Sequence, residues 1–207
     1  MKYRIEYYTH PCNEVLIIAS GPSFNQEQHE AARKWREQDP SRLVVVINRT
    51  NETVQWADML YTIDGKFARV WEHKHKDFGG IKVIHECASY KPEGWKIVRQ
   101  TQTGNSGSAA IEVVARWGAN TIWLMGFDAT FADDGKRHHH EDYPAKPDNE
   151  HPKDWCMNCP NIHEFKNYFN RAIKMAKGAG AEVYNLSPLS NLQADKKTLR
   201  DFIDEHR

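Results

Sequence analysis

Short runs of branched apolar residues alternate with longer polar stretches along the chain. The runs are residues 15–19, 43–47, 59–63, 81–84, 121–125 and 181–186, and residues 95–98 are extended in part. Continuous apolar runs of this length are typical of strands that are buried on both faces, as in a parallel sheet. We expect the run at 181–186 to be the last strand.

The stretches between these runs carry apolar residues at helical spacing. Helices are expected over residues 25–38, over 52–57, through Phe67, Val70 and Trp71, from Ala109 to Trp117, and over 163–178. Strands that alternate with helices predict a single doubly wound, mostly parallel α/β sheet with helices on both faces.

The length of 207 residues fits one domain over 1–207, which we interpret as a nucleotide-binding α/β domain. Residues 129–162 have little regularity and are rich in His, Asp, Pro and Lys. A loop this long is usually functional or disordered, so we interpret this His- and Cys-containing loop as an insert or lid.

Charge, hydropathy and cysteine content narrow the kinds of partner and the cellular location that we expect. Lys plus Arg total 28 and Asp plus Glu total 28, a formal net charge of zero. This balance excludes broad, non-specific DNA coating, although a local basic patch stays open. No apolar run approaches the roughly 20 residues of a membrane span, and residues 1–6 lack a signal-peptide core. We expect a cytoplasmic protein with reduced thiols, no membrane span and an oligomeric state that the sequence leaves open.

Small and polar residues follow several predicted strands directly, and another polar loop precedes the helix at Ala109. In open α/β sheets, ligands bind beyond the carboxyl ends of the strands, near the switch point in strand order. We therefore expect these residues to bind a nucleotide or a nucleotide-sugar. They are Ser20, Gly21, Pro22, Ser23, Asn48, Arg49, Asp64, Thr103, Gly104, Asn105, Ser106, Gly107 and Asp128.

Each of these clusters also has a purely structural interpretation. Ser23 can cap a helix, and Arg49 can either grip a phosphate or belong to a solvated turn. Asp64 and Asp128 can bind ribose hydroxyls or a metal, or cap helices. The loop at 103–108 has neither a Walker ending nor a GxGxxG fingerprint, so the ATPase and NAD interpretations lose support.

The histidines and cysteines of the 129–162 stretch indicate a metal site. The candidate zinc ligands are His138, His140, Cys156 and Cys159. Zinc takes three or four protein ligands, and the single Cys-x-x-Cys pair supplies two, so a histidine would have to complete the site. The alternative is a surface loop with reduced thiols.

His163 begins the last helix that we expect, over 163–178, and precedes Glu164. A histidine titrates near neutral pH and can act as a general acid or base at the rim of a cleft. It can equally be an ordinary residue at the start of a helix.

Read together, these motifs resemble the bacterial sialyltransferases of the Campylobacter type. They are also similar to the DUF115 (MptE-like) proteins and to phage proteins of similar length. The residues that carry the resemblance are 15–23, Asn48-Arg49, 106–108, 122–128 and the stretch from His163 to Ser190. The resemblance implies a Rossmann-like sheet of the GT-A-variant type. The chain is shorter than the sialyltransferases, and its His/Cys insert is foreign to their pattern.

The resemblance also implies an activity, a nucleotide-sugar-dependent glycosyltransferase that requires no cofactor and in which His163 deprotonates an acceptor hydroxyl. The acceptor would be a glycan or a modified nucleobase. The implied donor contacts are Gly21, Pro22, Ser23, Asn48, Ser106, Gly107 and Asp128. Similarity to MptE implies a different enzyme, a pyrophosphokinase that uses ATP and Mg²⁺ with Asp64 and Asp128 essential. A non-catalytic nucleotide-binding protein is the third hypothesis.

Overall fold

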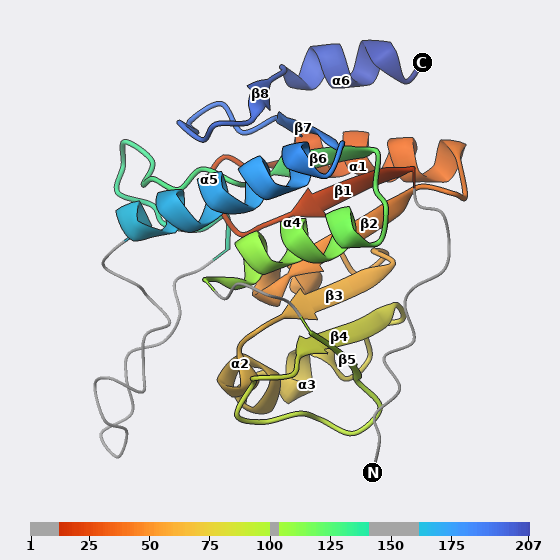
Figure 1. Cartoon of the computed structure of the whole chain (residues 1–207), viewed down its shortest axis with the longest axis vertical. Helices are drawn as coiled ribbons and strands as arrows, with labels where there is room; N and C mark the ends of the chain where they lie inside the picture. The colour runs from red at the N-terminus through yellow and green to blue at the C-terminus, as the bar shows by residue number, and fades with distance from the viewer. Residues whose placement is uncertain (1–12, 100–103, 141–161) are drawn as a thin grey trace.

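The computed structural model describes residues 13–99, 104–140 and 162–207, with side chains in the last range from residue 164. Over these residues the chain forms one sheet of eight parallel strands in the order β5-β4-β3-β2-β1-β6-β7-β8 (Figure 1). The strands are β1 (Glu14–Ile18), β2 (Leu43–Ile47), β3 (Met59–Thr62), β4 (Ile81–His85), β5 (Lys96–Val98), β6 (Thr121–Met125), β7 (Glu182–Asn185) and β8 (Asp195–Lys196). The expected doubly wound α/β sheet is confirmed.

The central strands are apolar throughout because both faces of the sheet are covered. On β1, Val15 and Ile17 belong to one hydrophobic cluster, while Leu16 and Ile18 belong to the cluster on the opposite face. All four side chains are essentially inaccessible to solvent. Neither face can therefore carry the polar residues that alternate along a half-exposed strand.

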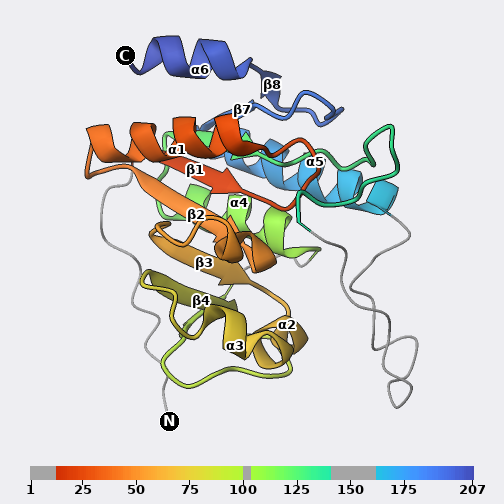
Figure 2. The ribbon, with the colours of Figure 1, turned by 180° about the vertical axis from the view of Figure 1, so that it is seen from behind.

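Helices cover both faces. They are α1 (Gln26–Gln38), α2 (Gly65–Val70), α3 (Glu72–His75), α4 (Ser106–Arg116), α5 (Ile162–Gly178), α6 (Leu199–Glu205) and the 3-10 helix η1 (Asn48–Glu52). Figure 1 shows α4 and α5 in front of the sheet, and Figure 2 shows α1 on the opposite face. The buried residues of α1, α2 and α6 share one cluster, and those of α4 and α5 share the other. In the part of the chain described, no helix has the length and apolar character needed to cross a membrane.

Three details differ from the sequence-based expectation. The helix expected over 52–57 is wrong, because η1 begins directly after β2 and ends where Thr50 O accepts the amides of both Thr53 and Val54. Helix α4 begins at Ser106 rather than at Ala109. The run at 181–186 is not the last strand and the helix over 163–178 is not the last helix, since β8 and α6 follow them. The two residues of β8 are exposed and polar, so hydrophobic patterning could not reveal them.

The strand order changes direction at β1, which pairs with β2 on one side and with β6 on the other. The turns that leave β1 and β6 are held together by backbone hydrogen bonds. Ala19 N donates to Met125 O and Gly21 N donates to Gly126 O, both at 2.9 Å. The switch point of the sheet therefore lies at the carboxyl ends of these two strands, where ligands bind in folds of this kind.

Candidate functional site

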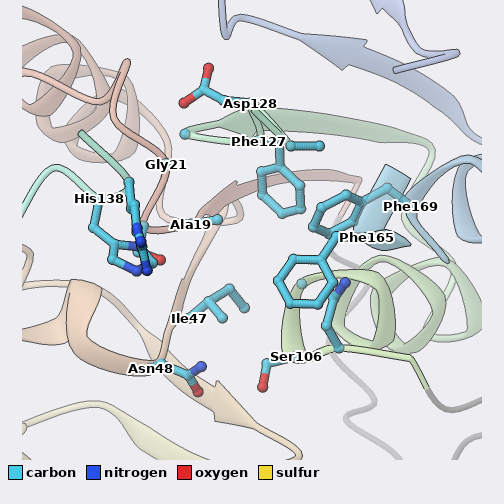
Figure 3. A pocket seen from close by; sticks show the side chains of 16 residues that line it. Ala19, Gly21, Ile47, Asn48, Ser106, Phe127, Asp128, His138, Phe165 and Phe169 are labelled. Carbon is cyan, nitrogen blue, oxygen red and sulfur yellow. The ribbon is translucent and has the colours of Figure 1, made fainter. Parts of the chain in front are cut away.

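A pocket with about 570 Å³ of empty space, some of it open to solvent, lies at this switch point (Figure 3). Its walls come from the residues after β1, β2 and β6, from the first turn of α4 and from α5. The lining residues are Ala19, Ser20, Gly21, Ile47, Asn48, Asn105, Ser106, Gly107, Gly126, Phe127, Asp128, Ala129, Arg137, His138, Phe165 and Phe169.

The turns after β1 and β6 pack so closely that two glycines are required. A Cβ on Gly21 would collide with the side chain of Asp128 and with the carbonyl of Gly126. Gly126 itself has a φ of +68°, and a Cβ there would collide with the carbonyl of Ala19. This close approach places the carboxylate of Asp128 directly beside the turn that follows β1.

Asp128 is a buried carboxylate in which only one of the two oxygens has a hydrogen-bond partner among the residues described. Its side chain is 2% exposed, and Oδ2 accepts a hydrogen bond of 2.9 Å from Ser23 N. Oδ1 has no hydrogen-bond partner among the residues described. Burial raises the pKa of Asp128, and the hydrogen bond from Ser23 N opposes this rise. A buried acceptor without a partner lowers stability, and Asp128 is one of the residues that line the pocket.

Asn48 and Ala129 are the two non-glycine residues of the described chain with left-handed backbone, at φ values of 49° and 52°. Both line the pocket. This conformation costs about 1–2 kcal/mol for a residue with a Cβ, and such strain clusters at functional sites. The buried Oδ1 of Asn48 has no partner in the described ranges, so it adds a second open acceptor.

The first turn of α4 forms the opposite side of the pocket from Asp128 (Figure 3). Asn105 caps the helix, accepting from Ser108 N at 2.9 Å, while Ser108 Oγ accepts from Asn105 N at 3.1 Å. Ser106 Oγ accepts from Ile63 N at 3.2 Å, which fixes the helix to the end of β3. The amides of Ser106 and Gly107 have no intrahelical acceptor, and the helix dipole gives them partial positive charge. This turn suits an anion.

An aromatic wall closes one side of the pocket. The Phe127 and Phe169 rings are edge to face with centroids 5.3 Å apart, and the Phe165 centroid lies 6.5 Å from that of Phe169. A Cβ on Gly107 would press against the rings of Phe169 and Phe127, so glycine is needed there too. These rings offer a flat apolar surface beside the polar groups. Sequence reasoning placed Phe165 and Phe169 on an apolar helix face but not in the site.

The loop of residues 129–140 forms the remaining wall and carries Arg137 and His138 into the pocket lining. His139 N donates to Ser20 O at 3.1 Å, and its ring meets Phe24 edge-on with centroids 5.1 Å apart. Burial, reinforced by the nearby His140 and His138, lowers the pKa of His139 to about 3. His139 is therefore neutral at physiological pH and anchors the loop beside the turn after β1.

Several expected site residues lie elsewhere. Arg49 Nε donates to Glu52 Oε1 at 2.6 Å, and its guanidinium lies over the Trp71 ring. Asp64 caps α2 by accepting from Lys66 N at 2.8 Å. Neither Arg49 nor Asp64 is among the residues that line the pocket, and the Mg²⁺-ATP hypothesis stays a prediction.

Other expected residues border the pocket or fall outside the description. Ser23 borders it through its bond to Asp128, Pro22 lies within the same turn after β1, and Gly104 packs against Tyr168. Thr103 lies outside the described residues. So do Cys156 and Cys159.

The expected base and zinc ligands stay predictions. His163 is the second residue of α5, two positions before Phe165, and its side chain is not among those described. The rings of His138 and His140 stack with centroids 4.9 Å apart. Within ranges 13–99, 104–140 and 162–207 there is no group of three or more His, Cys, Asp or Glu side chains able to hold a metal ion.

Comparison of the chain with protein-family models, with curated proteins and with solved structures found no match. The chemistry of the pocket therefore carries the functional argument. Its main components are open buried acceptors on Asn48 and Asp128, the amino end of α4, an aromatic wall and the cationic Arg137.

Proposed function

We propose that the chain binds a nucleotide-sugar in the switch-point pocket and transfers the sugar to an acceptor hydroxyl. The observation that carries the proposal is the meeting of three recognition chemistries within one pocket. Asp128 and Asn48 provide acceptors, Ser106 and Gly107 provide helix-end amides, and the phenylalanines provide an apolar surface.

A nucleotide has a matching part for each of these chemistries. Ribose hydroxyls are donors that suit the open oxygens of Asp128 and Asn48. A phosphate suits the amino end of α4. A base suits the rings of Phe165 and Phe169, because stacking on an aromatic side chain is worth about 1–3 kcal/mol.

The proposed transfer needs a base and a stabilised leaving group. His163 would take the proton of the acceptor hydroxyl, whose oxygen then forms the new bond to the anomeric carbon. The bond between that carbon and the donor phosphate oxygen breaks, and the nucleotide leaves with the electron pair. The amides of Ser106 and Gly107 would stabilise the charge that develops on the phosphate. The protein groups needed for this chemistry all belong to the chain.

The test is calorimetric titration with nucleotides and sugar nucleotides, followed by assays of donor hydrolysis. We expect one base family to bind, and we expect His163→Ala to lose at least about 100-fold in turnover while keeping its affinity. His73→Gln, an exposed histidine on α3, is the matched control and should retain full turnover. Binding of a nucleotide without any turnover would reduce the function to nucleotide binding. Failure of every nucleotide to bind would overturn the proposal.

A further inference from the structure

A cluster of buried polar side chains lies beside the turn that follows β6. Asn185 is the last residue of β7, and Ser187 and Ser190 follow it in the chain. Their exposed fractions are 3%, 2% and 0%, and none of the three is among the described residues that line the pocket. Buried polar side chains lower stability unless they are hydrogen-bonded, so the bonds of this cluster indicate its role.

Two of these side chains hold the backbone of Phe127 from both sides. Phe127 N donates to Ser187 Oγ at 2.8 Å, and Asn185 Nδ2 donates to Phe127 O at 3.4 Å. Asn185 Oδ1 accepts from Ser187 N at 3.0 Å, so the two side chains also fix each other. The backbone hydrogen bonds described between the ends of β6 and β7 reach as far as Leu186 N, which donates to Leu124 O at 2.9 Å. Beyond that point, side chains supply the partners of the Phe127 peptide groups.

The backbone that these side chains hold belongs to the pocket wall. Phe127 and Asp128 both line the pocket (Figure 3). Asp128 Oδ2 accepts from Ser23 N at 2.9 Å, across the two turns. Because peptide groups are planar and rigid, a shift of the Phe127 backbone would move the Asp128 carboxylate relative to Ser23. The positions of the Phe127 ring and of the carboxylate therefore depend on how firmly the Phe127 backbone is held.

We infer that Ser187 and Asn185 are positioning residues of the pocket, which fix the Phe127 ring and the Asp128 carboxylate without contacting the ligand. A site binds more tightly when hydrogen bonds behind it hold its contact residues in place beforehand. A buried network in which each side chain is bonded provides this rigidity. The inference rests on the proposed function where it concerns nucleotide affinity, and it goes beyond that function by assigning a role to residues outside the pocket lining.

A pair of serine variants tests this role. Ser187→Ala removes the acceptor of Phe127 N, and Ser190→Ala is the matched control. Ser190 is at least as buried, but its hydroxyl accepts from Asn185 Nδ2 at 2.9 Å and from Leu192 N at 3.3 Å rather than from the turn after β6. Both variants therefore lose one buried hydroxyl, while Ser187→Ala alone removes a direct bond to the pocket wall.

Hydrogen exchange of the Ser23 amide, measured by NMR on the ligand-free protein, reports whether Asp128 stays in place. We expect this amide to exchange about tenfold faster in Ser187→Ala than in the parent chain, since that factor corresponds to the loss of one hydrogen bond. We expect no change in Ser190→Ala. A general loss of stability would act on both variants and would not single out an amide that exchanges by local opening.

Calorimetric titration of the same proteins with ribonucleoside monophosphates and diphosphates measures the effect on the pocket. We expect Ser187→Ala to lower nucleotide affinity about tenfold, because the contact residues are no longer held in place before binding. Ser190→Ala should bind these nucleotides as the parent chain does.

The outcomes separate this inference from the proposed function. Equal exchange at Ser23 in the two variants refutes the positioning role and leaves nucleotide binding standing. Faster exchange in Ser187→Ala with unchanged nucleotide affinity also refutes it. If no nucleotide binds to the parent chain, the proposed function fails, and faster exchange at Ser23 in Ser187→Ala alone still supports the positioning of Asp128.

Discussion

The carboxylates at the two ends of the sheet differ in how fully they are hydrogen-bonded. At the amino end, Asp58 accepts hydrogen bonds from Arg36 Nε at 2.8 Å, from Arg36 Nη2 at 3.0 Å and from Val44 N at 2.8 Å. At the carboxyl end, Asp128 accepts one bond from Ser23 N and keeps Oδ1 open within the described structure. Asp58 is also the more exposed of the two, with a quarter of its side chain accessible.

This difference in hydrogen bonding distinguishes a carboxylate that stabilises the fold from one that is a candidate for binding a ligand. The partnered carboxylate at the amino end ties α1 to the starts of β2 and β3. The carboxyl end instead carries left-handed Asn48 and Ala129 and the unpartnered acceptor of Asp128, and all three residues line the pocket. Features that lower stability persist where function requires them. The amino end is therefore the scaffold, and the carboxyl end is the candidate site.

The largest expected effect comes from Gly21→Ala, which breaks the close approach on which the carboxyl end depends. The new Cβ would collide with both Asp128 and the carbonyl of Gly126, so the two turns must separate. We expect a loss of about 3 kcal/mol in the free energy of unfolding, together with loss of nucleotide binding. Urea denaturation measures the first effect and calorimetry the second.

The control for this substitution is Gly79→Ala, because a Cβ at Gly79 meets nothing within 4 Å. It should change the free energy of unfolding by less than about 0.5 kcal/mol. If the two alanine variants were equally stable, the turns after β1 and β6 would have to be looser than the structure shows.

The second largest effect is expected for Asp58→Ala, which should change stability without changing nucleotide affinity. Asp58→Ala removes the partner of both Arg36 and Val44 N, and we expect it to lower the free energy of unfolding by about 2 kcal/mol. Nucleotide affinity should stay unchanged, because Asp58 lies at the opposite end of the strands. Arg33→Ala, which breaks an exposed pair with Glu37 on the same helix, should cost only about 0.5 kcal/mol. A large loss of affinity in Asp58→Ala would mean that the two ends are not independent.

The parallel sheet and the position of the pocket could be predicted from the sequence. Continuous apolar runs predict buried parallel strands, and ligands of such sheets bind at the carboxyl ends of the strands. The sequence predicts Gly21, Asn48, Ser106 and Asp128 as ligand-binding residues, and all four line one pocket. Their chemical roles stay predictions.

Sequence could not choose between the two arginines. Arg49 directly follows a strand and is the more obvious phosphate ligand. Its neighbours Glu52 and Trp71 take its guanidinium, while the course of the 129–140 loop brings Arg137 to the pocket. Tertiary contacts determine which arginine lines the pocket, and local sequence patterns do not specify these contacts. The apolar spacing of Phe165 and Phe169 likewise predicts a buried helix face but not the pocket that this face meets.

Apart from the control variants, the smallest expected effect on stability comes from Asp128→Asn, and its sign is opposite to that of Gly21→Ala and Asp58→Ala. Burial raises the pKa of Asp128, so the folded chain binds the proton more tightly than the unfolded chain does. The free energy of unfolding is therefore highest below the pKa of Asp128 in the unfolded chain, about 4. It falls as the pH rises through the higher pKa that Asp128 has in the folded chain. Asparagine keeps an acceptor for Ser23 N and carries no charge. We expect Asp128→Asn to raise the free energy of unfolding by about 1 kcal/mol at pH 7, measured without ligand, and we expect this gain to fade towards pH 4.

The same substitution should weaken the binding of the nucleotide about tenfold, because an amide is a poorer acceptor than a carboxylate for ribose hydroxyls. A variant that is more stable but binds less tightly is the signature of a group retained for a ligand rather than for the fold. Asp58→Asn provides the contrast, since it should lose stability at pH 7 and keep its affinity. If Asp128→Asn instead lost stability at pH 7, its open oxygen would have a stabilising partner in the free protein, and the contrast between the two ends of the sheet would fail.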